Sequence, residues 1–509
     1  MTLIEIQLIC MKQVIFSLVL FLNLFSAAAI NYHIQPNGND SNDGLSFTKA
    51  FKTIQIATNK AKAGDSIFVY DGFYKGFDHF YKASGTALNP IVYLAKGNQV
   101  IINQSCGRGF DGINVEGVDY IELIGFKVKN ISDPVGNGED GIRAVLANHV
   151  TIRNCEVDSC YRGIFTGYTD DFLSENNLCK RSYGEHGIYV SNNSDRVVVR
   201  YNKCHGNKAA GIQLNPDLSS GTPGISVDVK IYNNICYDNR IGLNLQGIHQ
   251  SEVYNNLLYN NGSNGGGNGM TFFLGDAATG CNNVKVYNNT VIVPSSSQWA
   301  VLAIDSDSLF FYNNIFLSYS QKGSLDIESS CTNIRSDYNL LTDKMTVNQG
   351  SSYINFAQWK NLGYDLNSST VLDISSVFKN SANNDFHLDF NSIAKDKGTT
   401  LVSDLVKDDL EFLKRPQGKA YDIGCYEVVQ FADTKNENIS KEKIKWSIES
   451  GIIHFHVDEK DAELLLYDMR GALVNVGTSA PIDLLRGHVI LYVLYDKNGM
   501  SSGKLLIDF

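Results

Sequence analysis

Apolar and polar residues alternate along much of the chain in short runs, which is the period-2 pattern of half-buried β-strands. One such run follows Gly187, where Ile188 and Val190 are expected to face inward while Tyr189 and Ser191 face outward. The run after Gly211 repeats this pattern. The sequence therefore predicts many short strands, each with one face on a core and one face in solvent.

A phrase built around asparagine recurs between Cys155 and Phe316, for example as Ile-Tyr-Asn-Asn-Ile-Cys and Val-Tyr-Asn-Asn-Leu-Leu. One asparagine from each copy gives Asn177, Asn202, Asn234, Asn256, Asn289 and Asn314, at steps of 25, 32, 22, 33 and 25 residues. About 22 to 25 residues with occasional insertions is the length of one coil of a parallel β-helix. We expect each amide to hydrogen-bond its own backbone at a turn and to stack on the neighbouring coil.

A second phrase, a residue followed by Gly-Ile or Gly-Leu, opens six of the predicted strands between positions 111 and 243. Parallel strands lie about 4.8 Å apart, so the outward residues of successive coils should form one continuous polar face. These patterns predict an all-β chain, a right-handed parallel β-helix with a small C-terminal β-sandwich.

The ends of the chain differ from its repetitive middle. Residues 1–29 combine Lys12, an apolar run and three small residues, which predicts a signal peptide whose translation starts at Met11. Residues 30–430 are expected to form the β-helix catalytic domain, 431–443 a polar, lysine-rich linker, and 444–509 the β-sandwich. The net charge of −11 argues against nucleic-acid binding, and no later stretch predicts an integral membrane segment.

Several motifs resemble those of secreted right-handed β-helix proteins of the pectate-lyase-like superfamily. The opening segments 36–40, 51–55, 63–65 and 69–74 resemble the N-terminal cap of these proteins, and Tyr421-Asp-Ile-Gly-Cys-Tyr-Glu427 resembles their closing segment. The resemblance implies an enzyme similar to polysaccharide lyases and to ulvan oligosaccharide dehydratases. Its partner would be an anionic polysaccharide or oligosaccharide.

The C-terminal segments 465–471, 482–484 and 504–507 resemble the sorting domain of the type IX secretion route. This resemblance implies the type IX secretion machinery as a partner and a secreted or cell-surface location. A small β-sandwich that binds carbohydrate is the alternative.

Two departures from the pectinase pattern bear on metal chemistry. Asp140-Gly141-Ile142-Arg143 carries an arginine in place of a second carboxylate, and Thr271 stands where relatives have a basic lysine. We therefore predict no metal and no cofactor, with calcium as the alternative. Cys155, Cys179, Cys204 and Cys236 are expected to form a row of small buried side chains.

The outward residues suit β-elimination on a uronic acid, which needs a neutralised carboxylate, a base for the C5 proton and an acid for the group leaving C4. We predict His186 as the base, Tyr189 as the acid and Arg162 as the third catalytic residue. The predicted substrate-binding residues are Asp140, Arg143, Gln213, Asn215, Asn244, Gln246 and His249.

Other functions remain open at this point. A polysaccharide lyase and a dehydratase acting on a terminal uronate would use the same residues, and a groove blocked by the insertion 216–224 would favour the dehydratase. A glycoside hydrolase would need two carboxylates, for which Asp111, Asp140, Glu185 and Asp217 are the candidates. A non-catalytic glycan-binding protein is the third alternative.

Overall fold

The computed structural model describes residues 29–428, except 133–138, 264–265 and 276–277, together with the backbone of seven strands between 444 and 506. The predicted signal peptide (except Ala29) and the predicted linker lie outside the described residues. In the part of the chain that is described, no helix has the length and apolar character needed to cross a membrane.

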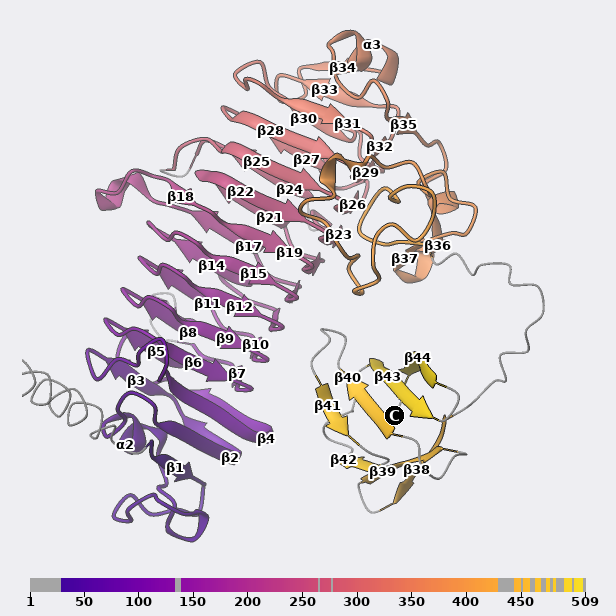
Figure 1. Ribbon diagram of the computed structural model, residues 1–509. Helices are drawn as coiled ribbons and strands as arrows, with labels where there is room; N and C mark the ends of the chain where they lie inside the picture. The colour runs from indigo at the N-terminus through magenta and orange to yellow at the C-terminus, as the bar shows by residue number, and fades with distance from the viewer. Residues whose placement is uncertain are drawn as a thin grey trace, which may run out of the picture.

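The main domain is a solenoid of three stacks of strands, arranged like rungs from the indigo N-terminal coils to the orange C-terminal coils (Figure 1). All pairings within the stacks are parallel, except that of the last strand of the front stack. The front stack is a 12-stranded sheet. Its strands are β3 (Phe77–Phe80), β5 (Ile113–Glu116), β8 (Asp140–Val145), β11 (Arg162–Gly167), β14 (Ile188–Ser191), β17 (Ala210–Asn215), β21 (Ile241–Gln246), β24 (Met270–Phe273), β27 (Val301–Ala303), β30 (Leu325–Ile327), β33 (Met345–Val347) and β34 (Ser352–Ile354).

Two side stacks complete each coil and share the long strands at the N-terminal end. The shared strands are β1 (Asn31–Ile34), β2 (Ser66–Lys75) and β4 (Ile91–Gln104). The first side stack continues with β6 (Ile121–Ile124), β9 (Thr151–Arg153), β12 (Leu173–Glu175), β15 (Val198–Arg200), β18 (Ser226–Val227), β19 (Lys230–Tyr232), β22 (Ile248–Tyr254), β25 (Asn282–Tyr287), β28 (Asp307–Tyr312) and β31 (Arg335–Asp337). The second continues with β7 (Lys127–Lys129), β10 (Glu156–Asp158), β13 (Leu178–Lys180), β16 (Lys203–His205), β20 (Ile235–Tyr237), β23 (Leu257–Tyr259), β26 (Thr290–Val293), β29 (Ile315–Ser318), β32 (Leu340–Leu341) and β35 (Ser369–Thr370).

The remaining elements are short. They are the helices α2 (Ile54–Thr58) and α3 (Phe356–Asn361), five 3₁₀ turns, and the antiparallel pair β36 (Phe378–Asn380) and β37 (Asp385–Leu388). The C-terminal region forms two antiparallel sheets of its own: β38 (Ile444–Glu449), β39 (Ile452–Val457) and β42 (Ser479–Pro481) in one, and β40 (Glu463–Tyr467), β41 (Leu473–Val476), β43 (Val489–Asp496) and β44 (Gly499–Leu506) in the other. The predicted all-β parallel β-helix is thus confirmed.

The core of the solenoid is a column of apolar side chains stacked coil on coil. Ile164, Ile188, Ile212 and Leu243 occupy equivalent positions on successive front strands, and all four are fully buried. The inward position predicted for Ile188 is confirmed. Because every coil contributes the same kind of residue here, each coil buries its apolar face on its two neighbours.

Pairs of asparagines lie at the turns that lead from the first side stack to the second. The first asparagine of a pair turns the chain, and the second bonds neighbouring coils. In the pair Asn255-Asn256, Asn255 takes the left-handed conformation (φ 53°) that turns the chain. The amide of Asn256 donates to the Ile231 carbonyl of the preceding coil (2.9 Å) and to Oδ1 of Asn289 in the next coil (2.9 Å). The predicted stacking is confirmed. The predicted bond of the amide to its own turn is present at Asn234 and Asn289, which also donate to the carbonyls of Tyr232 and Tyr287 (3.1 and 3.2 Å).

Three of the four predicted cysteines form one buried row. Cys179, Cys204 and Cys236 pair in register on β13, β16 and β20, and each is fully buried. Cys155 is buried as well but lies outside the row, because Val157 is the residue that pairs with Cys179. The nine cysteines in the described residues are all free thiols.

Residues 396–428, which end with the motif at 421–427 and which we call the closing segment, pack back onto the side of the solenoid. The amides of Asn233, Asn288 and Asn313 donate to the carbonyls of Asp409, Asp422 and Thr399 at 3.2, 3.0 and 2.9 Å. A buried ion pair of Arg415 with Glu427 (2.7 Å) lies within this segment. The closing segment therefore covers the side of the solenoid that lies away from the front stack.

Candidate functional site

The front stack gathers the predicted site residues except His249, together with Phe165, onto one outward surface, which we call the polar strip. Arg143, Phe165, Tyr189, Gln213 and Asn244 occupy equivalent positions on five successive strands, β8 to β21. Other members lie beside this row: Asp140, Arg162, His186, Asn215 and Gln246. The regular spacing of the strands, about 4.8 Å, rather than proximity in sequence, creates the strip.

His186 lies at the corner that leads into β14, and its ring contacts Tyr189 edge-on with centroids 4.9 Å apart. Its Nδ1 accepts a hydrogen bond from the backbone N–H of Ala210 on the next coil (3.0 Å). In a neutral imidazole the other nitrogen then carries the proton, so Nε2 is a donor. Burial lowers the His186 pKa to about 4; the Glu185 carboxylate opposes this shift, and the Arg162 charge adds to it. This geometry does not support the base role predicted for His186, because its one lone pair is occupied.

We expect the His186 ring to titrate near pH 4 instead of near the ordinary value of about 6.5. Between pH 6.5 and pH 4 the imidazole is protonated in the unfolded chain and neutral in the native protein. The contribution of this group to the free energy of unfolding therefore decreases as the pH falls from about 6.5 to about 4. NMR titration of the ring protons, assigned with His186→Gln, measures the value. A His186 titration between pH 6 and 7 would contradict the lowered pKa of this ring.

Tyr189 occupies the middle of the polar strip and is partly exposed. Asn215 Nδ2 approaches its hydroxyl oxygen at 3.4 Å, and its ring packs between His186 and Phe165, whose centroid is 5.3 Å away. A phenol held by ring contacts on two sides keeps its hydroxyl in a fixed place. Tyr189 is therefore well positioned to exchange a proton with a ligand lying on the strip.

Both strip arginines are held by carboxylates of the protein itself. Arg143 Nη1 donates to Glu116 Oε2 (2.6 Å) and to the side-chain amide oxygen Oδ1 of Asn114 (2.7 Å). Arg162 forms a two-point ion pair with Glu185 (2.6 and 3.1 Å) and reaches Asp140 at 3.4 Å. If Arg162 acts in catalysis and Arg143 binds substrate, as predicted, each must share its charge between these partners and a substrate carboxylate.

A cluster of amides continues the strip beyond Tyr189. Gln213 accepts from Asn244 Nδ2 (2.6 Å) and donates to Gln246 Oε1 (3.0 Å). Among the described residues, Oδ1 of Asn215, Oδ1 of Asn244 and Nε2 of Gln246 are buried without a hydrogen-bond partner. Buried polar atoms are nearly always satisfied, so each of these three has the capacity for one more hydrogen bond, to water or to a ligand that reaches it.

Carboxylates cluster at the opposite end of the strip. The Asp140 N–H donates to Asp111 Oδ1 (3.0 Å), and burial raises the pKa of both carboxyl groups. Tyr183 donates to Glu139 Oε2 (3.1 Å), and Oε1 of this buried carboxylate has no partner among the described residues. Asp140 already contacts Arg162, and no group of three or more His, Cys, Asp or Glu side chains suited to a metal exists in the described ranges. These donors do not fit calcium, which prefers six to eight oxygens.

One predicted residue does not join the strip. His249 lies past the corner on β22 of the first side stack, and its Nε2 is 3.1 Å from the Gly280 carbonyl oxygen. The substrate-binding role predicted for His249 therefore has no support in the geometry, because a corner of the coil separates it from Gln246. Conversely, the contacts of Glu139 with Tyr183 and of Glu116 with Arg143 were not predicted, since each joins residues at least 27 positions apart.

Comparisons with known proteins agree with this architecture. Residues 87–219 match the family described as "Right handed beta helix region", and no curated protein matches the chain. The structure of pectate lyase Pel9A is 16% identical, with a TM-score of 0.51 over 78% of this chain and 96% of that chain. A rhamnogalacturonan lyase is 17% identical, with a TM-score of 0.46 over 69% of this chain and 91% of that chain. An alginate lyase from Paenibacillus sp. str. FPU-7 is 19% identical, with a TM-score of 0.40 over 55% of this chain and 94% of that chain. The chain is a right-handed parallel β-helix, as predicted.

Proposed function

We propose that this protein is a secreted carbohydrate-active enzyme that performs β-elimination on a uronic-acid residue of an acidic glycan. The observation that carries the proposal is the arrangement of His186, Tyr189 and the amide cluster on one face of the front stack. This arrangement combines a hydrogen-bond donor, a proton-transferring hydroxyl and unsatisfied amides within a few strand spacings. Secretion, by the predicted signal peptide and type IX sorting domain, is part of the same proposal.

In this proposal the strip residues divide the work differently from the sequence-based prediction. His186 Nε2–H donates to the sugar carboxylate, which makes the C5 proton more acidic. Tyr189 acts as the phenolate: its oxygen takes the C5 proton and then gives it to the C4 oxygen as this departs, so that the C5–H and C4–O bonds break, a C4–C5 double bond forms and the phenolate is regenerated. The amides of Asn215, Asn244 and Gln246 bind sugar hydroxyls. The leaving group is a sugar for a lyase or water for a dehydratase.

Incubation with uronate-rich glycans, such as ulvan, alginate or pectin fragments, is expected to yield a product that absorbs ultraviolet light. Elimination creates a double bond conjugated with the carboxylate, whereas hydrolysis creates only new reducing ends. We expect the same rate with and without a calcium chelator, because no step uses a metal. Loss of activity with the chelator, or reducing ends without new absorbance, would contradict this proposal.

A second candidate function is glycoside hydrolysis, which the Asp111–Asp140 pair favours. Two carboxyl groups whose pKa values are raised by burial can keep a proton near neutral pH, as a general acid must. The ultraviolet assay separates the two functions. Under hydrolysis Asp140→Asn would abolish turnover, whereas under elimination Tyr189→Phe would.

A further inference from the structure

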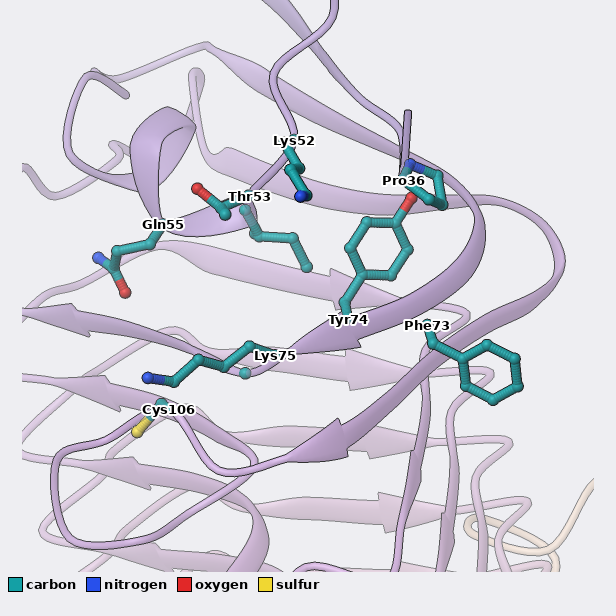
Figure 2. Close-up of a pocket in the computed structure, with 10 residues that line it drawn as sticks. Pro36, Lys52, Thr53, Gln55, Phe73, Tyr74, Lys75 and Cys106 are labelled. Carbon is teal, nitrogen blue, oxygen red and sulfur yellow. The ribbon is translucent and has the colours of Figure 1, made fainter. Parts of the chain in front are cut away.

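Two adjoining pockets lie at the N-terminal end of the front stack. The first, of about 310 Å³, lies between the residues that precede α2 and the end of β2, where Lys52, Lys75 and Gln55 border the same space (Figure 2). The second, of about 510 Å³, extends from Lys75 past the outward side chains of β3, Asp78 and Phe80. Gln55, Lys75 and Cys106 line both pockets, so the two form one surface, which we call the basic end pocket.

The basic end pocket concentrates positive charge in a protein whose net charge is −11. Its charged lining residues are Lys52, Lys75, Lys82 and Arg108 against a single carboxylate, that of Asp78. Arg108 neutralises this carboxylate (3.1 Å) and lies over the Phe80 ring at 3.5 Å. The three lysines have no carboxylate within ion-pair distance in the described ranges of the chain. Unpaired charges of one sign in a hollow raise the local concentration of the opposite ion.

The basic end pocket lies on the same line as the polar strip. Asp78 pairs in register with Asn114, Asn114 with Arg143, Arg143 with Phe165, and Phe165 with Tyr189. Four strand steps of about 4.8 Å place Asp78 about 19 Å from Tyr189 along the stack. This separation is greater than one sugar ring spans, so only a chain of several sugars reaches both places.

We propose that the basic end pocket is a distal subsite that binds a carboxylate or sulfate group of an acidic glycan whose reacting uronate lies at Tyr189. This inference rests on the proposed function and adds to it: the substrate is a polyanionic chain several residues long. Lysine suits this task as a mobile point charge that follows anions in different positions. Phe80, which is partly exposed and lies under the Arg108 guanidinium, adds an aromatic side chain to the lining of this pocket.

The test compares two double variants with the same change in charge. Lys75→Gln/Lys82→Gln removes two lysines of the basic end pocket, and Lys60→Gln/Lys62→Gln removes two exposed lysines near α2 that do not line it. Calorimetry measures binding of size-fractionated polyuronate chains, of uronate disaccharides, of sulfated glucan and of uncharged glucan. For long polyuronate or sulfated chains, the pocket variant is expected to raise Kd about three- to tenfold, as the loss of two exposed ion pairs implies. The uronate and sulfate arms then show which anion it binds.

The control variant is expected to change Kd less than twofold, and uronate disaccharides should bind both variants equally because they do not span the distance. Equal losses in the two variants, or no loss in the pocket variant, would overturn the subsite. The binding measurement does not depend on turnover, so a protein that binds long chains through Lys75 and Lys82 but makes no unsaturated product would refute the proposed elimination and leave the subsite standing.

Discussion

Replacing Tyr189 by phenylalanine is expected to lower kcat by about two to four orders of magnitude, the usual loss when a proton-transferring group is removed. The phenyl ring keeps the contacts with His186 and Phe165, so KM should change little. This combination, a large loss in kcat with KM retained, is the signature of a group that acts in the transition state. Initial rates from the ultraviolet signal, measured over substrate concentrations from below KM to saturation, give kcat and KM.

Tyr237→Phe is the matched control for that measurement. Tyr237 is a partly exposed tyrosine on β20 of the second side stack, where it lies parallel to Tyr259 with centroids 4.7 Å apart. It is remote from the polar strip, so the loss of its hydroxyl should leave kcat and KM unchanged. Full activity of Tyr189→Phe would remove Tyr189 from the mechanism, even though the fold would stand.

Replacing Arg415 by methionine is expected to destabilise the closing segment by about 3–5 kcal/mol, because it leaves the Glu427 carboxylate buried without its counter-charge. Both side chains are fully buried, and Arg415 also donates to the carbonyls of Asp422 (3.2 Å) and Gly424 (2.7 Å). Hydrogen exchange of residues 396–428 measures the free energy of local opening, which is more informative for a solenoid than a single melting temperature.

Arg153→Met is the control for the closing segment. Arg153 also pairs with a carboxylate, Glu122 (3.0 Å), but its side chain is 39% exposed. An exposed pair contributes at most about 1 kcal/mol, so exchange in residues 396–428 should not change. Equal protection of the closing segment in Arg415→Met and the unaltered protein would show that the Arg415–Glu427 pair does not hold this segment in place.

The fold was predictable because each coil repeats the same turn residues and the same alternation of apolar and polar side chains. An asparagine every 22 to 33 positions between Asn177 and Asn314 marks one coil after another, and the alternation around Ile188 gives the inward face. These signals depend on turn conformation and side-chain period, which a sequence displays directly. The row of cysteines was predictable for the same reason, except at Cys155, where the offset of two residues from Val157 moves it out of register.

The members of the polar strip were predictable from the same alternation, but their protonation and pairing were not. The donor role of His186 depends on the N–H of Ala210, a residue 24 positions later that only the stacking of coils brings near. Arg143 and Arg162 likewise meet Glu116 and Glu185 through the register of neighbouring strands. Which side chains of neighbouring coils meet depends on the strand register to within one residue. Insertions such as 216–224 vary the length of the coils, so this register cannot be read from the sequence.

The most direct test of the central claim is a crystal structure of the Tyr189→Phe variant with a long acidic oligosaccharide bound. We predict that the sugar chain follows the front stack, with one uronate carboxylate within hydrogen-bond distance of His186 Nε2 and its C5 atom facing the ring of residue 189. A chain bound along either side stack, or one that crosses the front stack away from His186, would contradict the proposed site.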